Sequence, residues 1–331
     1  MRSSDNPSRK ATSFDVARQA GVSRATVSRT FTPNASVSPE TREKVHKAAK
    51  ELGYRVNYLA RSLINRRSDL VGIVVAGMDN PFRAQQVHEI AKALVSRNFR
   101  PILLPADQGE SADHVMDQLL HYNVSGVLVT SDAPPTELCR EFAVHGIPIV
   151  LINKGDPIPL VDRVISDNAT AGRVAAETLV ECGAKQLAVL SASHVSYAAR
   201  HREAAFVARG MDLGCAPRVV PVLINDYQNG LAAGRDLDGI DGLFCINDYM
   251  ACGVIDALRT KPQDPKNRIR LIGHDDIGQA AWQAYGLTTF RQPCDIQASQ
   301  AIDLLISRMA DPELEERTVL TPVTLVRRVT A

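Results

Sequence analysis

Short apolar runs alternate with amphipathic stretches from residue 69 to the C-terminus. Runs of strand length read "LVGIVV", "RPILLP", "GVLVTS" and "IPIVLI", with helical periodicity between them near 84–96 and 111–121. The alternation repeats through "RVIS", "QLAVLS", "GLFCI" and "IRLIG", with helices predicted from residues 168, 198 and 248. A strand–helix–strand order is typical of a parallel, doubly wound sheet. Two such sheets in tandem predict a two-lobed α/β body with a cleft between the strand ends.

The N-terminal part of the chain has a different, all-helical pattern. Thr12 has the sequence context of a helix N-cap, and Gly21 ends that helix after two turns. Ser23 is placed to cap a second helix, in which Val27 and Phe31 lie one turn apart and can pack inward. Two short helices that cross over a tight turn are a helix-turn-helix unit.

The outer face of the second helix has side chains that suit DNA. Opposite its apolar side lie Arg24, Ala25, Ser28 and Arg29. Arginine can donate two hydrogen bonds to guanine, and an alanine methyl can contact the methyl group of thymine. A third helix is predicted after Ser38 and Pro39, up to Gly53. The alternative is an ordinary three-helix bundle with a charged surface.

Charge separates the two parts of the chain. Residues 1–67 contain 14 Lys and Arg against five acidic residues, a net charge of +9. Since the whole chain has a net charge of +1, the remainder has −8. A basic head on an acidic body is the pattern expected when the head alone binds a polyanion. A basic surface that is merely solvated is the alternative.

A short amphipathic segment, "NYLARSLINRRS" at 57–68, joins the two parts. Leu59 and Leu63 lie one turn apart in it, but the segment is too short to form a stable isolated helix. A leucine presented to the minor groove can wedge between base steps and kink the duplex. An ordinary linker is the equally supported interpretation.

The sequence lacks the common signatures of catalysis and metal binding. No GxGxxG follows the first strand, and no GxxxxGK[ST], GxSxG or HExxH occurs. Six scattered cysteines have no zinc-ligand spacing, so we expect buried apolar side chains at Cys139, Cys182, Cys215, Cys245, Cys252 and Cys294. We therefore expect neither enzyme activity nor a cofactor or metal.

The apolar runs are too short to cross a bilayer, and the polar residues 1–11 lack the apolar core of a secretory signal. We expect a cytosolic protein that makes no membrane contact.

Ordered motifs along the chain carry a family resemblance. They are "DVARQAGVSRATVSR", "VSPETREKVHKAAKELGY", "NYLARSL", "NPF" at 80–82, "DN" at 167–168, "NDYMACG" at 247–253, "GHDD" at 273–276 and "LTTFRQP" at 287–293. From about Thr12 to the C-terminus, the chain resembles the lactose-repressor (LacI/GalR) family of bacterial transcription regulators. The first two motifs together are highly specific.

The resemblance implies a domain plan. The parts are a flexible leader (1–11), a helix-turn-helix headpiece (12–56), a hinge helix or linker (57–68) and an effector-binding, dimerisation body (69–331). By resemblance the chain crosses between lobes near 165, 293 and 323. The N-lobe then comprises about 69–165 and 294–323, and the C-lobe about 166–292 and 324–331.

The resemblance also implies the partners. Two headpieces of a homodimer would bind a pseudo-palindromic operator, with Leu63 wedging open the minor groove at its centre. The DNA-binding residues are then Thr12, Ser23, Arg24, Ala25, Thr26, Ser28, Arg29, Asn57, Leu59, Ala60 and Leu63. We expect a dimer rather than a tetramer, since "LVRRVTA" follows shortly after the last strand and leaves no heptad tail.

A small effector, a sugar or sugar derivative, is expected between the lobes. The matching positions are Phe82, Arg83, Asn153, Ser196, Arg202, Tyr227, Asn247 and Asp275. Arginine, amide and carboxylate groups can bind neighbouring hydroxyls while the Tyr227 ring stacks on the apolar side of a sugar. The alternatives are a surface salt bridge for Arg202 and a turn cap for Asp275.

Two positions depart from the family pattern. Arg83 and His274 stand where many relatives have aromatic side chains. If both face the cleft, they favour an anionic effector, a sugar acid or sugar phosphate. An Arg83 side chain that points to solvent is the alternative.

Effector binding would shift the lobes and change the spacing of the hinges. We expect a repressor, with activation at some promoters, and both signs of the effector response remain open. The rival hypotheses are a periplasmic sugar-binding type of solute-binding protein, which would need a signal peptide, and an enzyme built on the same lobes.

Overall fold

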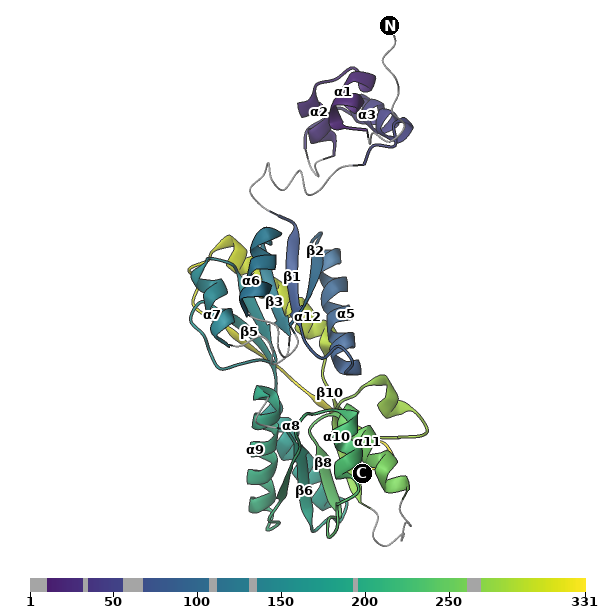
Figure 1. Cartoon of the computed structure of the whole chain (residues 1–331), viewed down its shortest axis with the longest axis vertical. Helices are drawn as coiled ribbons and strands as arrows, with labels where there is room; N and C mark the ends of the chain where they lie inside the picture. Colours follow the sequence, from purple (N-terminus) through teal and green to yellow (C-terminus); the bar gives the residue numbers. More distant parts are fainter. Residues whose placement is uncertain are drawn as a thin grey trace. The chain divides into compact units, whose positions relative to one another are not determined.

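The computed structural model describes residues 11–31, 35–55, 68–106, 112–130, 136–192, 196–260 and 269–331. The chain divides into two compact units, Met1–Ser68 and Asp69–Ala331. The first unit contains the helical headpiece, and the second contains all of the strands (Figure 1).

The headpiece consists of α1 (Ser13–Ala20), α2 (Arg24–Thr30) and α3 (Pro39–Glu51). Its predicted caps are confirmed. The backbone N–H and the hydroxyl of Thr12 donate to Asp15 Oδ2 at 3.0 and 2.7 Å, and Gly21 ends α1 with φ of 66°. Ser23 Oγ accepts from the N–H of Thr26 at 3.1 Å. The three helices enclose a small core formed by Val16, Ala17, Val27, Val45, Ala48 and Ala49.

The first sheet of the body is parallel throughout and has the order β11-β5-β4-β3-β1-β2. Its strands are β1 (Leu70–Val75), β2 (Arg100–Pro105), β3 (Gly126–Thr130), β4 (Ile149–Ile152), β5 (Asp162–Ser166) and β11 (Thr318–Thr321). The helices of this lobe, the N-lobe, are α5 (Pro81–Ser96), α6 (Ala112–His121), α7 (Thr136–Val144) and α12 (Cys294–Ala310). Along β1, Val71 and Ile73 belong to the core cluster of α5 and α12, whereas Val74 belongs to the other cluster. Both faces of the sheet are therefore buried, as the apolar runs predict.

The second sheet forms the C-lobe and has the order β12-β10-β9-β8-β6-β7. Its strands are β6 (Leu187–Ser191), β7 (Arg218–Pro221), β8 (Gly242–Cys245), β9 (Arg270–Asp275), β10 (Thr288–Arg291) and β12 (Thr324–Val326). Its helices are α8 (Asn168–Glu181), α9 (Tyr197–Asp212), α10 (Tyr227–Ala233), α11 (Asp248–Arg259) and the 3₁₀ turn η3 (Gly278–Ala281). The strands pair in parallel except β12, which is antiparallel to β10.

The chain passes between the two sheets three times. It leaves the first sheet after β5, returns from β10 into α12, and crosses again between β11 and β12. As a result α12 (yellow) packs beside α5 (blue), although about 200 residues separate them (Figure 1). Each lobe is therefore built from segments that are discontinuous in sequence.

The cysteines only partly follow the expectation of full burial. Cys139, Cys245, Cys252 and Cys294 are buried, but Cys182 and Cys215 are half-buried, and all six are free thiols. Cys182 ends α8 and Cys215 follows α9, and helix ends near the surface leave such side chains partly exposed.

A buried carboxylate anchors the returning segment in the N-lobe. Asp162, the first residue of β5, accepts two hydrogen bonds at 3.0 Å from the Arg308 guanidinium of α12. It also accepts from the backbone N–H, Nε and Nη2 of Arg317 at 2.8, 3.1 and 2.8 Å. Burial alone would raise the pKa of Asp162, but hydrogen bonds from Arg317 and Arg308 lower it below its usual value.

We predict that Asp162→Ala lowers the free energy of unfolding by about 3–5 kcal/mol, because it leaves two guanidinium groups without their buried partner. Chemical denaturation at neutral pH measures this loss. Since the folded-state pKa lies below the unfolded value of about 4, the contribution is present above that pH and is lost as pH falls.

Asp303→Ala is the matched control, since Asp303 pairs with Arg97 at 2.8 Å on the surface. Its loss should stay below about 1 kcal/mol. Equal losses in the two variants would contradict the anchoring role of Asp162.

Candidate functional site

The exposed face of α2 gathers the residues predicted to read bases. Arg24, Ala25, Ser28 and Arg29 are all exposed, whereas Val27 on the opposite side is buried in the headpiece core. The structure thus brings these four side chains onto one accessible surface.

Three other predicted DNA-binding residues lie at helix N-termini. Thr12 and Ser23 are the N-caps of α1 and α2, and Thr26 Oγ1 lies 2.9 Å from Ser23 Oγ. Their hydroxyls are therefore hydrogen-bonded within the headpiece. The remaining predicted positions, Asn57, Leu59, Ala60 and Leu63, lie outside the described residues, as does the leader up to residue 10.

Phe14 is a residue of this surface that the sequence analysis missed. The guanidinium carbon of Arg24 lies 3.9 Å from the centroid of the Phe14 ring. The ring is 62% exposed and does not join the headpiece core. The sequence could have revealed Phe14, because it is a large apolar residue that lies outside the apolar face of a short helix.

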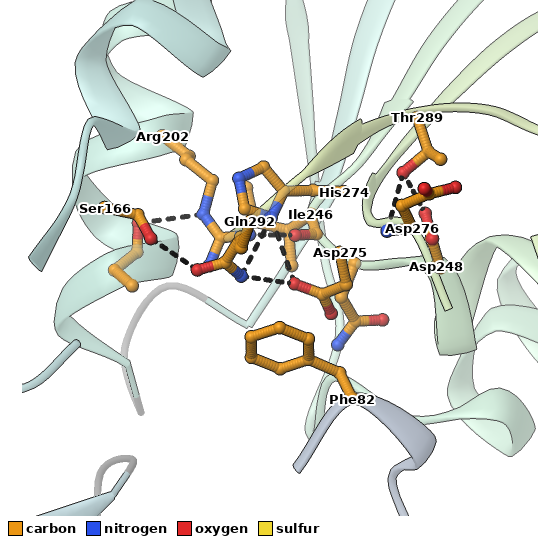
Figure 2. A network of polar contacts seen from close by, with 12 residues as sticks. Phe82, Ser166, Arg202, Ile246, Asp248, His274, Asp275, Asp276, Thr289 and Gln292 are labelled. Carbon is orange, nitrogen blue, oxygen red and sulfur yellow. Dashed lines mark hydrogen bonds and ion pairs between the residues drawn. The ribbon is translucent and has the colours of Figure 1, made fainter. Parts of the chain in front are cut away.

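Polar side chains from the crossing segments form a buried network between the lobes. Gln292, which follows β10, donates from Nε2 to Asp275 Oδ1 at 2.7 Å, and its Oε1 accepts from Asn153 Nδ2 at 3.0 Å. The hydroxyl of Ser166 also donates to Gln292 Oε1, and the N–H of Ser166 donates to Asn153 Oδ1 at 2.8 Å. Figure 2 shows Gln292 between Ser166 on one side and His274 and Asp275 on the other.

A side chain of α12 connects the third crossing, which follows Thr321, to the same network. Gln297 Nε2 donates to Ser166 Oγ at 2.7 Å and to Thr321 Oγ1 at 3.0 Å. We call Asn153, Ser166, Asp275, Gln292, Gln297 and Thr321 the crossover network. Of these, the sequence analysis had identified only Asn153 and Asp275.

The side chains of Arg202, from α9, and Asn247, the N-cap of α11, lie beside the end of β8 in the C-lobe. Arg202 is buried and donates from Nη1 to the carbonyl of Ile246 at 2.7 Å, which contradicts the surface salt-bridge alternative. Asn247 caps α11 by accepting from the N–H of Met250 at 2.8 Å, and its Nδ2 donates to the carbonyl of Asn225 at 2.9 Å. Backbone groups therefore fix the orientation of both side chains.

Asp275 ends β9 with an unusual backbone conformation. Its φ of 125° lies in a region that L-residues rarely adopt, and the residue is buried. Rather than capping a turn, its carboxylate accepts from Gln292 and contacts Nδ1 of His274 at 3.0 Å. Strained backbone is frequent at ligand-binding sites.

His274 does not give the cleft positive charge. The ring is completely buried, and among the described residues its Nε2 has no hydrogen-bond partner. Burial, with a smaller effect from the charge of Arg202, lowers the pKa of His274 to about 4. The imidazole is therefore neutral near pH 7, which corrects the expectation drawn from its sequence position.

The two predicted N-lobe residues on α5 behave differently. Phe82 is buried within the core cluster of the C-lobe, and its ring lies beneath Asp275 and Gln292 in Figure 2. Arg83 instead donates from Nη1 to the carbonyl of Ala76 at 2.8 Å. Its guanidinium thus holds the loop between β1 and α5 of its own lobe, where Gly77 has φ of 60°.

Tyr227 and Ser196 lie on other parts of the C-lobe. The Tyr227 hydroxyl donates to Asp256 Oδ2 at 2.8 Å. Asp256 lies nine residues after Asn247, about 13 Å along α11. The ring itself lies beside that of Tyr249, with the two ring centroids 6.1 Å apart. Ser196 caps α9 by accepting from the N–H of Ala199 at 3.3 Å.

Asp248 explains why two of the sequence motifs belong together. Its buried carboxylate accepts from Thr289 Oγ1 at 2.5 Å and from the N–H of Ile277 at 3.0 Å, and burial raises its pKa well above the usual value. A Cβ at Gly273 would collide with Asp248 Oδ1. The "NDYMACG" and "GHDD" motifs therefore pack against each other beside the candidate site.

The described residues contain neither a cluster of metal ligands nor a membrane-spanning helix. No group of three or more His, Cys, Asp or Glu there could hold a metal ion. None of the helices in these segments is long and apolar enough to cross a membrane.

Comparison with known proteins identifies the class. Residues 14–57 match the bacterial regulatory proteins of the lacI family, and residues 176–331 match a periplasmic binding protein-like domain. The HTH-type transcriptional regulator CelR of Thermobifida fusca is 31% identical over 338 residues, which cover 96% of this chain and 98% of that protein.

Solved structures agree over nearly the whole length. A lac repressor dimer bound to operator and the anti-inducer ONPF has a TM-score of 0.84 and 25% identity, with 97% of this chain and 99% of that chain covered. A transcriptional regulator CelR–cellobiose complex has a TM-score of 0.71 and 27% identity, with 97% and 100% covered.

A helix-turn-helix headpiece joined to a two-lobed binding body defines a DNA-binding transcriptional regulator. The chain belongs to the lacI family of bacterial regulatory proteins. The resemblance and the fold class predicted from the sequence are thereby confirmed. The hypothesis that the protein is an enzyme is rejected, because this family consists of regulators.

We predict that the His274 imidazole stays neutral throughout the neutral pH range. Because its folded-state pKa of about 4 lies below the unfolded value, protonation favours unfolding. The stability it contributes is present above pH of about 6.5 and is lost as pH falls from there toward 4. Ring ¹⁵N and ¹³C shifts of labelled protein, assigned with His274→Gln, measure the titration. A midpoint near 6.5 would contradict the buried, neutral assignment.

Proposed function

We propose that the protein is a homodimeric repressor whose affinity for a pseudo-palindromic operator is controlled by a small carbohydrate bound between its lobes. The observation that carries this proposal is the convergence of Arg202, Asn247 and Asp275 beside the crossings that join the two lobes. A site at the crossings can convert ligand contacts into a change of lobe arrangement. The cellobiose complex of CelR and the operator-bound lac repressor dimer support the two partners.

In the effector site, each buried group has a distinct role. The Asp275 carboxylate accepts hydrogen bonds from ligand hydroxyls, and the Arg202 and Asn247 side chains donate to ligand oxygens. Phe82 supplies apolar contact from the N-lobe, and Asn153 contacts the ligand from the same lobe. Ser196 and Tyr227 remain candidates for the rim of the site.

We favour a neutral carbohydrate over a sugar acid or sugar phosphate. The anionic hypothesis depended on Arg83 and His274. Arg83 already donates to the carbonyl of Ala76, and the low pKa of His274 leaves that ring uncharged. The carboxylate of Asp275 is also unfavourable for an anionic ligand.

At the operator, α2 lies in the major groove of each half-site. Arg24 and Arg29 donate to base edges, with Ala25 and Ser28 in apolar and polar contact between them. Thr12, Ser23 and Thr26 lie near phosphates at the helix N-termini. Asn57, Leu59 and Ala60 contact the minor groove, where Leu63 kinks the duplex.

An exposed aromatic strip supports the dimer. Trp282 is more than half exposed and stacks on Tyr285, with ring centroids 6.4 Å apart. The hydroxyls of Tyr285 and Tyr227 both donate to Asp256, which joins the strip to α10 and α11. An exposed apolar patch of this kind marks an interaction surface, and we assign it to the partner protomer.

The proposed effector class is tested by calorimetric titration of the purified protein with neutral mono- and disaccharides and with the matching sugar acids. We expect binding of a neutral sugar and no binding of its acid. Asp275→Asn should weaken that binding about tenfold or more, because it removes hydrogen bonds to a charged acceptor.

Arg83→Ala is the control, since its guanidinium is directed to the backbone of its own lobe. It should change the affinity much less than Asp275→Asn. A ligand that proves to be an acid and depends on Arg83 would reject the neutral-carbohydrate proposal.

A further inference from the structure

An aromatic side chain on α1 lies against the first residue of the proposed recognition helix. Phe14 is the second residue of α1, and Arg24 is the first residue of α2. The arginine guanidinium lies over the face of the ring, 3.9 Å from its centroid. The headpiece core is complete without Phe14, so core packing does not account for a phenylalanine at this exposed position.

The contact leaves the hydrogen-bonding edge of Arg24 available. A guanidinium stacks through its flat face, whereas its N–H groups point outward in the plane of the group. Guanine is read by two parallel N–H donors along that edge. The same arginine can therefore stack on Phe14 and donate to a base at the same time.

A guanidinium that is held in place before DNA binds should lower the entropic cost of binding. A long exposed side chain loses rotational freedom when it is ordered at an interface, and preorganisation reduces that loss. The second predicted base-reading arginine, Arg29, differs, because its side chain makes no hydrogen bond, ion pair or ring contact within the described headpiece. Arg18 is held differently again, through an exposed ion pair with Asp15 at 3.0 Å.

We propose that Phe14 is a positioning residue that holds Arg24 for recognition of one guanine in each operator half-site. Base specificity at that position then depends on α1 as well as on α2. The proposal deepens the proposed function and rests on it, since it requires the headpiece to bind DNA specifically.

The operator is first obtained by selection with the full-length protein from a pool of randomised duplexes. Single base-pair replacements in the selected duplex, tested with wild type and Arg24→Ala, locate the G·C pair whose replacement no longer matters in the variant. Fluorescence anisotropy then gives the discrimination ratio at that position, which is the dissociation constant of the A·T duplex divided by that of the G·C duplex.

Phe14→Leu should lower this discrimination ratio about two- to fivefold, the effect expected from losing a surface cation–π contact. Phe14→Tyr keeps the ring and should restore the ratio. Because Phe14 is exposed, the melting temperature, the nonspecific affinity and the salt dependence should match wild type in both variants. A ratio that is unchanged in Phe14→Leu would overturn the proposal.

A double-mutant cycle separates positioning from direct contact. In an Arg24→Ala background, Phe14→Leu should have no further effect on affinity or discrimination. An equal effect in both backgrounds would show that Phe14 itself contacts DNA, and would overturn the positioning role. If the wild-type protein enriches no sequence from the pool, the proposed sequence-specific DNA binding is rejected. That result is distinct from an unchanged ratio in Phe14→Leu, which rejects only the role of Phe14.

Discussion

The structure of the body depends on one buried amide at the point where its lobes meet. Gln292 donates to the Asp275 carboxylate at the end of β9 and accepts from Asn153 and Ser166 at the ends of β4 and β5. An amide is suited to this position because it has both donors and an acceptor. Loss of either partner would leave a buried polar group unsatisfied, which costs more than the net gain from an ordinary hydrogen bond.

The crossover network makes the three crossings act together. Ser166, Gln292 and Thr321 each come from a different crossing, and Gln297 of α12 donates to two of them. A rotation of one lobe must exchange these hydrogen bonds as a group, so intermediate arrangements are disfavoured. One member of this network, Asp275, is also a candidate effector residue and accepts directly from Gln292. A ligand that contacted Asp275 would therefore be coupled to the arrangement of the lobes through few side chains.

Much of the architecture could be predicted from the sequence, because local signals and packing agree. Central strands with continuous apolar runs were identified, as were the caps Thr12, Ser23 and Ser38. The edge strands β7, β11 and β12 were not predicted, because short and largely accessible segments have no apolar run to reveal them. The inner strand β10 was also missed, because three of its four residues, "TTFR", are polar although the first three are buried. Arg202, Asn247 and Asp275 were identified by resemblance, which gives positions in sequence but no side-chain direction.

The directions of side chains and the protonation state of His274 could be determined only from the three-dimensional structure. The Tyr227 hydroxyl donates to the Asp256 carboxylate, and nothing local in "NDYQNG" indicates that partner. His274 is neutral because the folded chain buries it beside Arg202, which lies 72 residues earlier in the sequence. Gln292 was part of the "LTTFRQP" motif, but the sequence indicated no role for its side chain. Its importance comes from partners about 120 to 140 residues earlier.

The proposed function requires that the crossover network couples the effector site to the operator. Its most direct test is the ratio of operator dissociation constants with and without saturating sugar, measured for wild type and for Gln292→Leu. We predict a ratio of about 5 to 150 (or its inverse) in wild type and a ratio close to 1 in Gln292→Leu, with direct sugar binding still detectable. A variant that binds sugar and keeps the full wild-type ratio would contradict the account.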